Sequence, residues 1–176
     1  MSLIFLIGYM GCGKTTLAKK LAKKLNYEWI DTDSFIEEKE GRSISEIFDI
    51  KGEAYFRKFE LQCIENLSKD KSLIVSTGGG LPCYNNLIEI LNQKGITIYL
   101  ERNPKELFQR LQKGKYKRPL LANKSDDELL LFIEENLEKR VHIYRKSKII
   151  LDRDHQTVES IIQILGYSDF PSFRED

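Results

Sequence analysis

The sequence lacks long apolar runs and a strong charge of either sign, and each absence excludes a class of protein. No stretch approaches the roughly 18 apolar residues that a membrane-spanning helix requires, so we expect no membrane protein. The 28 basic and 27 acidic side chains leave a net charge of +1. That near balance argues against a general nucleic-acid binder, which needs a basic face.

Cysteine is also scarce. The three cysteines, Cys12, Cys63 and Cys83, match no zinc-binding spacing, so we expect reduced thiols in a cytoplasmic protein. The apolar stretch LIFLI at 3–7 is too short for a signal peptide and is better explained as a buried strand. The 176 residues suit one domain, 1–176, which we expect to be monomeric, with a frayed tail at 166–176.

Strand-like and helix-like segments alternate along the chain. The apolar, β-branched segments that predict strands are 2–7, 29–30, 72–76, 96–100 and 148–151. The segments with helical periodicity are 14–25, 35–40, 53–68, 84–93, 104–111, 126–146 and 156–165, with a further start near residue 43. This alternation predicts an α/β domain with a mostly parallel sheet, whose ligands bind at the carboxyl ends of the strands. The basic segment 112–124 has little periodicity and predicts a mobile lid.

A glycine-rich turn follows the first predicted strand and opens the first predicted helix. Residues 8–15 read GYMGCGKT, the P-loop pattern G-x-x-x-x-G-K-[ST]. In such a loop the backbone N–H groups and the helix dipole hold phosphate, the lysine reaches the β- and γ-phosphates, and the hydroxyl after it ligates magnesium. The residues to which we assign ATP binding here are Gly11, Cys12, Gly13, Lys14, Thr15 and Thr16. The motif indicates the phosphate donor and leaves the acceptor open.

Two aspartates follow the short apolar stretch at 29–30. Asp31 and Asp33 stand in WIDTDSF, where either could simply cap a helix. Both also fall at a strand end near the expected P-loop magnesium. One carboxylate could then hold the metal shell while the other orients or deprotonates an acceptor hydroxyl. The spacing alone does not say which aspartate has which role.

Four arginines and a glycine triplet complete the candidates. Arg57 is either a surface side chain or a clamp for a substrate carboxylate. Arg140 has no acidic residue three or four positions away, so it is solvated or a second clamp. Arg118 in the basic segment could reach the transferring phosphoryl group, and Arg110 could stack on adenine. The triplet Gly78, Gly79 and Gly80 is a flexible turn or a close approach of backbone to ligand.

Taken in order, these motifs resemble the shikimate kinase family. The matching segments are 8–16 (P-loop), 31–33 (DTD), 41–48 (GRSISEIF), 52–60 (GEAYFRKFE), 78–80 (GGG), 118–121 (RPLL) and 140–144 (RVHIY). The resemblance covers about 3–152. It implies a nucleoside-monophosphate-kinase-like fold with a five-stranded parallel sheet flanked by helices and a lid. It also implies ATP- and Mg²⁺-dependent phosphorylation of the 3-hydroxyl of shikimate, in aromatic amino-acid biosynthesis.

The resemblance also assigns roles to single residues. It implies that Asp33 binds the substrate hydroxyls and serves as base, with Lys14 and Arg118 as the other catalytic groups. Arg57 and Arg140 would clamp the carboxylate. The remaining implied roles are substrate binding for Gly78, Gly79 and Gly80, metal binding for Thr15 and Asp31, and a lid position for Arg118. We also assign ATP binding to Arg110 and Arg118.

One region departs from the family, and two other functions compete with this one. The family often places an arginine near the adenine after the last strand, whereas the stretch 152–160, DRDHQTVES, offers Arg153 without a clear alignment. A different P-loop kinase, for gluconate or a nucleotide, would explain the phosphate loop equally well. Arg57 and Arg140, with the DTD and GGG motifs, favour a carboxylated polyol over a nucleotide as the acceptor. A nucleotide-binding module without catalysis would not need Asp33 and Arg118 together with Lys14.

Overall fold

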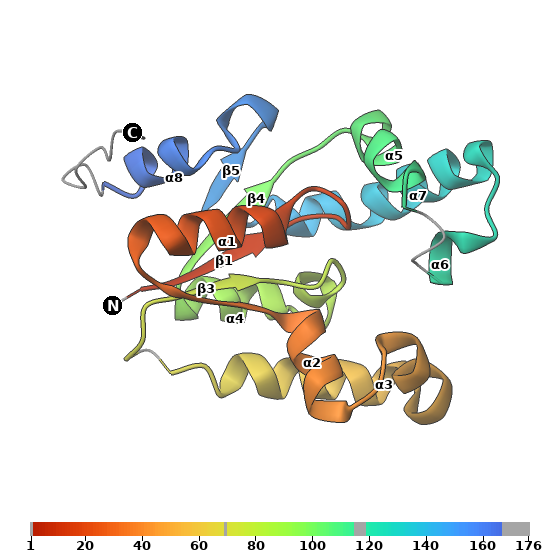
Figure 1. Ribbon diagram of the computed structural model, residues 1–176, viewed down its shortest axis with the longest axis horizontal. Helices are drawn as coiled ribbons and strands as arrows, with labels where there is room; N and C mark the ends of the chain where they lie inside the picture. Colours follow the sequence, from red (N-terminus) through yellow and green to blue (C-terminus); the bar gives the residue numbers. More distant parts are fainter. Residues whose placement is uncertain (1, 69, 115–118, 167–176) are drawn as a thin grey trace.

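The sheet has five strands, all parallel. The computed structural model describes residues 2–68, 70–114 and 119–166, and the spatial strand order is β2-β3-β1-β4-β5 (Figure 1). The strands are β1 (Leu3–Ile7), β2 (Glu28–Asp31), β3 (Leu73–Ser76), β4 (Ile96–Leu100) and β5 (Ile149–Leu151). Every residue of β1 is buried, as expected for a central strand covered on both faces. The predicted α/β class and parallel sheet are therefore confirmed.

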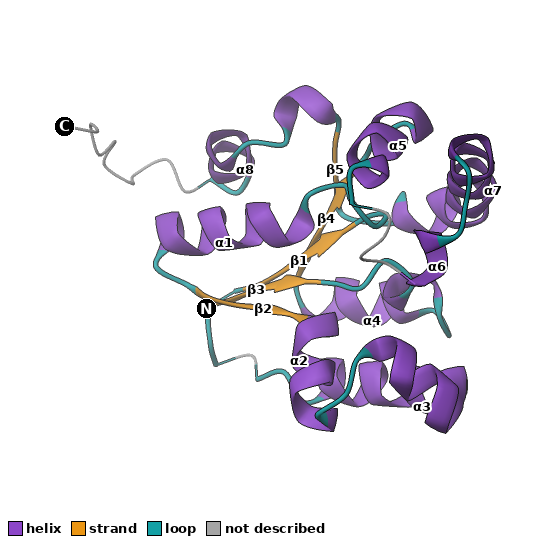
Figure 2. Ribbon diagram, turned by 45° about the vertical axis from the view of Figure 1, so that its right-hand side comes forward, coloured by secondary structure: helices purple, strands orange, loops and turns teal. Residues whose placement is uncertain are grey.

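Helices cover both faces of the sheet. They are α1 (Lys14–Leu25), α2 (Thr32–Glu40), α3 (Ile44–Glu65), α4 (Leu87–Lys94), α5 (Pro104–Gln112), α6 (Pro119–Ala122), α7 (Asp126–Tyr144) and α8 (Val158–Ile164), with short 3₁₀ helices η1 (Leu81–Cys83) and η3 (Arg153–His155). Figure 2 shows α1 and α8 on one side of the sheet and α4 on the other. The pair α2 and α3 packs together beyond the end of β2. No helix in the described part of the chain is long and apolar enough to cross a membrane.

Local sequence signals explain where α2 ends and where α3 begins and bends. Gly41 takes a left-handed conformation (φ 63°) and ends α2 where the sequence predicted a break. Ser43 then caps α3 through a reciprocal capping box with Glu46. Gly52 (φ 79°) is non-helical inside α3, so the two helical segments predicted there are one element with a kink.

Two expectations need correction. The helix expected at 84–93 begins later, at Leu87, because Asn85 and Asn86 take positive φ and η1 precedes them. The basic segment 112–124 does contain regular structure, since α6 lies in it and Leu121 is completely buried. Residues 115–118, including Arg118, and the tail from 167 lie outside the described residues, so the expected lid motion and fraying stay predictions.

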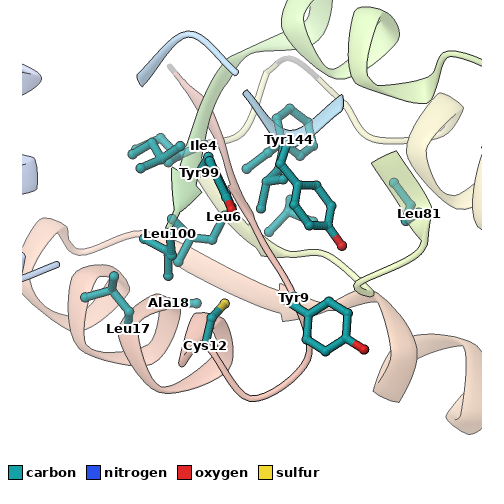
Figure 3. Packing of buried hydrophobic residues seen from close by; sticks show 14 of the residues in the cluster. Ile4, Leu6, Tyr9, Cys12, Leu17, Ala18, Leu81, Tyr99, Leu100 and Tyr144 are labelled. Atoms are coloured by element: carbon teal, nitrogen blue, oxygen red, sulfur yellow. The ribbon is translucent and has the colours of Figure 1, made fainter. Parts of the chain in front are cut away.

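The main apolar core reaches directly to the phosphate loop. Figure 3 shows Cys12 and Ala18 beside Leu17 and Leu100, under the turn between β1 and α1. Cys12 is 2% exposed, so its side chain fills space beneath the loop. The P-loop is therefore anchored on packed side chains rather than standing free.

Candidate functional site

The carboxyl ends of three neighbouring strands bring the predicted residues together. The P-loop follows β1, Asp31 is the last residue of β2, and the glycine triplet follows β3 closely. The register places Asp31 opposite Ser76, and Ser76 opposite Leu6. Segments that are far apart in sequence thus meet at one edge of the sheet, as expected for an α/β fold.

The phosphate loop has the conformation that its glycines permit. Gly8, Gly11 and Gly13 all have positive φ (147°, 80° and 110°), a region that L-residues rarely adopt. Lys14 is buried, and its ammonium group donates to the carbonyl oxygens of Gly8 and Tyr9 at 2.8 and 2.9 Å. The residues that line the adjoining hollow, of about 290 Å³, are Gly11, Gly13, Lys14, Thr15, Thr16 and Arg110.

Cys12 is placed differently from the other loop residues. Its N–H group donates to the carbonyl of Tyr9 at 3.2 Å, so this amide is engaged within the loop. Cys12 also lines a second pocket, of about 390 Å³, beside the P-loop. Arg110 lines both spaces and lies close to the loop, since a Cβ on Gly13 would be 3.2 Å from its Nη2.

One wall of the second pocket comes from the segment after β5, to which the sequence analysis assigned no certain site residue. Gln156 lines it together with Thr157 and Val158. The amide nitrogen of Gln156 donates to the backbone carbonyls of Glu101 and Leu151, which holds this segment against the sheet. Arg153 is 69% exposed, pairs with Glu106 at 3.2 Å and does not line this pocket. Only an alignment of this irregular stretch could have pointed to Gln156.

Asp31 caps α2, and its second carboxylate oxygen faces the threonine of the P-loop. Its Oδ1 accepts hydrogen bonds from the N–H groups of Asp33 and Ser34 and caps α2. Its Oδ2 accepts from the hydroxyls of Thr15 at 2.7 Å and Ser76 at 2.8 Å. Asp31 and Thr15 therefore form a compact set of oxygen atoms beside the phosphate hollow, the donor type that Mg²⁺ prefers. Among the described residues no group of three acidic, His or Cys side chains forms a metal cage, so phosphate oxygens and waters would have to complete the coordination.

The glycine triplet faces the charged groups of α2 and α3. A Cβ on Gly78 would overlap Oδ1 of Asp33 and lie 3.2 Å from Oε1 of Glu60. A Cβ on Gly80 would lie 2.8 Å from Nη2 of Arg57. Two carboxyl groups and a guanidinium thus occupy the space that side chains would fill, so this triplet is a close approach of backbone to charged groups.

Glu60 is a site residue that the sequence analysis missed. It is 1% exposed, and its Oε2 accepts a hydrogen bond of 2.6 Å from Nη1 of Arg57. Its Oε1 has no hydrogen-bond partner among the described residues. Burial raises the pKa of Glu60 to about 7, although the Arg57 charge opposes the shift. The spacing of three residues from Arg57 on a predicted helix was the available signal.

Asp33 has a similarly perturbed environment. Burial raises its pKa to about 6, and the nearby Asp31 charge adds to the shift, while Lys14 and Arg57 oppose it. A carboxyl group with a pKa near neutrality can exchange a proton with a bound hydroxyl more readily than an exposed one.

Arg140 reaches the same region from α7. Its guanidinium carbon lies 5.7 Å from the centre of the Tyr9 ring. Burial raises the pKa of Cys83 in η1, and the charges of the nearby Arg140 and Arg57 both oppose that shift. The hydroxyl of Tyr144 donates to the carbonyl of Gly79 at 2.5 Å and ties α7 to the glycine triplet.

The buried Glu60 predicts a pH-dependent stability that Glu60→Gln removes. Because its pKa is raised from 4.5 to about 7, the native state holds this proton more tightly than the unfolded chain does. The stabilisation is complete below pH 4.5 and is lost as the pH rises through about 7, a change of about 3 kcal/mol. Urea unfolding between pH 4 and 8 should show a steeper fall in wild type than in the variant. Parallel pH profiles for the two proteins would contradict this.

Comparison with known proteins agrees with this geometry. The family model for shikimate kinase matches residues 10–166. A shikimate kinase of Bacteroides fragilis is 43% identical over 166 residues, which cover 92% of this chain and 93% of that protein.

Solved structures give the same result. A shikimate kinase structure from Bacteroides thetaiotaomicron has a TM-score of 0.85 at 41% identity, over 95% of this chain and 97% of that one. A shikimate kinase from Acinetobacter baumannii in complex with shikimate has a TM-score of 0.81 at 32% identity, over 97% and 96% of the two chains. The chain therefore belongs to the shikimate kinase family.

Proposed function

We propose that this protein transfers the γ-phosphoryl group of ATP to the 3-hydroxyl group of shikimate, yielding ADP and shikimate 3-phosphate. The observation that carries the proposal is the grouping of charged side chains beside the P-loop at one sheet edge: Asp33 and Arg57 lie against the glycine triplet, and Arg140 lies over Tyr9 of the loop. The shikimate-bound relative supports the choice of acceptor. Shikimate carries one carboxylate and several hydroxyls, and two arginines with one aspartate complement those groups.

The donor half of the site binds ATP through the P-loop. The loop amides and the start of α1 receive the phosphates, Lys14 turns from the loop carbonyls to the β- and γ-phosphates, and Thr16 contacts the α-phosphate. The pocket between Arg110 and Gln156 receives the adenine. Arg118 is proposed to approach the transferring group, a role that rests on the sequence motif because the residue lies outside the described part of the chain.

The residues present fit a Mg²⁺ ion bound with the nucleotide. Thr15 would ligate it directly and Asp31 would hold its shell, since both present oxygen atoms at the edge of the phosphate hollow. When bound, the ion neutralises charge on the phosphate oxygens. The hydroxyl of Ser76 fixes Asp31 in place from the neighbouring strand.

The acceptor half positions one hydroxyl for attack. Arg57 and Arg140 clamp the substrate carboxylate, and the backbone of Gly79 with its neighbours forms the wall. The hydroxyl oxygen forms a bond to the γ-phosphorus as the bond to ADP breaks, and its proton passes to the carboxylate of Asp33. Most of the rate comes from this positioning, because phosphoryl transfer makes few demands on a base.

We also propose that the protein works as a monomer in the cytoplasm, with ATP as its co-substrate.

A coupled ADP-release assay tests the function. Purified protein with ATP and Mg²⁺ is given shikimate, gluconate, a nucleoside monophosphate or no acceptor. We expect turnover with shikimate alone. A nucleoside monophosphate has no carboxylate for the two arginines, and the open chain of gluconate presents its hydroxyls differently from the ring of shikimate. Turnover with gluconate or a monophosphate but none with shikimate would overturn the proposal, and ATP binding without turnover of any acceptor would favour a binding module.

A further inference from the structure

Two glutamates of α3 hold Arg57 on opposite sides of its guanidinium group. Nη1 donates to Oε2 of Glu60 at 2.6 Å. Nε and Nη2 both donate to Oε1 of Glu53, at 3.2 and 3.0 Å. A side chain proposed to clamp a substrate carboxylate is therefore already bound by two carboxylates of its own chain.

The two partners differ in how easily they can leave. Glu60 is 1% exposed and lies against Gly78, so the packing holds it in place. The side chain of Glu53 is 68% exposed and belongs to the first turn after the kink at Gly52. An exposed pair four residues apart on a helix contributes little to stability. Glu53 can therefore swing into solvent at small cost, whereas Glu60 cannot.

Glu53 and Glu60 contact different donors of the Arg57 guanidinium group. Gly80 lies against Nη1 and Nη2, since a Cβ there would be 3.0 and 2.8 Å from these atoms, and Glu60 covers Nη1. The remaining pair of donors, Nε and Nη2, is a fork of the kind that binds a carboxylate through two N–H groups. Glu53 occupies this fork.

We propose that the carboxylate of Glu53 occupies the position on Arg57 that the substrate carboxylate takes, and that the substrate displaces it. It occupies the Nε and Nη2 donors of Arg57 until the acceptor arrives, and the acceptor binds by replacing it, while Glu60 keeps the guanidinium in place. Glu53 thus lowers the apparent affinity for the acceptor through competition and through like-charge repulsion. This inference rests on the proposed function, since it takes a carboxylated acceptor to be the ligand of Arg57.

The test compares acceptor kinetics of wild type, Glu53→Ala and Glu53→Gln with ATP saturating. We expect KM for shikimate to fall about two- to fivefold in both variants, the range that corresponds to loss of one exposed ion pair. The methyl ester of shikimate, which lacks the charge, should show no such gain. Asp49→Asn is the matched control, because Asp49 is an exposed acid on the same helix before the kink. Its KM for shikimate should equal that of wild type.

Other outcomes separate this inference from the proposed function. A wild type that turns over shikimate, with an unchanged or raised KM in folded Glu53 variants, would overturn the inference alone, because Glu53 would then be idle or needed to orient Arg57. An equal gain with the methyl ester would also overturn it. A wild type without shikimate turnover would overturn the proposed function and this inference with it. Thermal melting of each variant verifies that it is folded.

Discussion

Asp33→Asn is expected to reduce phosphoryl transfer to shikimate by about 10²- to 10⁴-fold while ATP still binds. The asparagine has almost the same shape, so the packing against Gly78 is kept, but it cannot take up a proton. The carboxyl group of Asp33 faces the glycine triplet on the acceptor side rather than the P-loop hollow. Single-turnover transfer of labelled phosphate and the binding of a fluorescent ATP analogue measure the two effects separately.

The control for this variant is Ser34→Ala. Ser34 is the exposed neighbour of Asp33 on α2, and only its backbone N–H group takes part in the cap formed by Asp31. We expect wild-type turnover from it. If Asp33→Asn lost ATP affinity but kept normal turnover at saturating ATP, Asp33 would belong to the donor half and the assignment would be wrong.

Arg57→Ala is expected to lower kcat/KM for shikimate by about 30- to several-thousand-fold. Truncating one partner of a buried, hydrogen-bonded charge pair costs on the order of 2 to 5 kcal/mol. The same change leaves Glu60 buried without its guanidinium partner, which destabilises the fold or forces the carboxyl group to stay protonated. Steady-state kinetics and urea unfolding at pH 8 measure the two consequences.

A double variant separates the two roles of Arg57. In Arg57→Ala combined with Glu60→Gln no buried charge is left behind, so we expect stability near that of wild type with kcat/KM still low. Recovery of activity along with stability would show that Arg57 acts only by holding the fold. The matched control is Arg145→Ala, since Arg145 forms an exposed ion pair with Glu101 away from the glycine triplet. That variant should retain wild-type kinetics.

The P-loop was fully predictable because its determinants are local. Glycines at fixed offsets, a lysine and a threonine act within a few consecutive residues, and the flanking strand and helix follow from periodicity. The parallel sheet was predictable for a similar reason, since alternating strands and helices close in few ways. The position of the site at the carboxyl ends of the strands followed from that class.

The roles of the charged residues were less accessible. The helix cap predicted for Asp31 is confirmed, while its second oxygen atom accepts hydrogen bonds from α1 and β3, and its role toward a metal stays a prediction. In the sequence Glu60 is one acidic residue among several on a predicted helix, and only the tertiary structure shows that burial raises its pKa. Gln156, rather than Arg153, lines the pocket beside Arg110, and no periodicity marks that stretch.

By itself the sequence determined the fold class, the phosphate loop and the set of residues available for an acceptor. Only the tertiary structure decided how these residues pair: Asp31 with Thr15 and Ser76, and the glycine triplet with Asp33, Glu60 and Arg57. The physical reason is that local motifs specify backbone conformation within a few residues. Ion pairing, burial and pKa depend on side chains brought together from segments tens of residues apart.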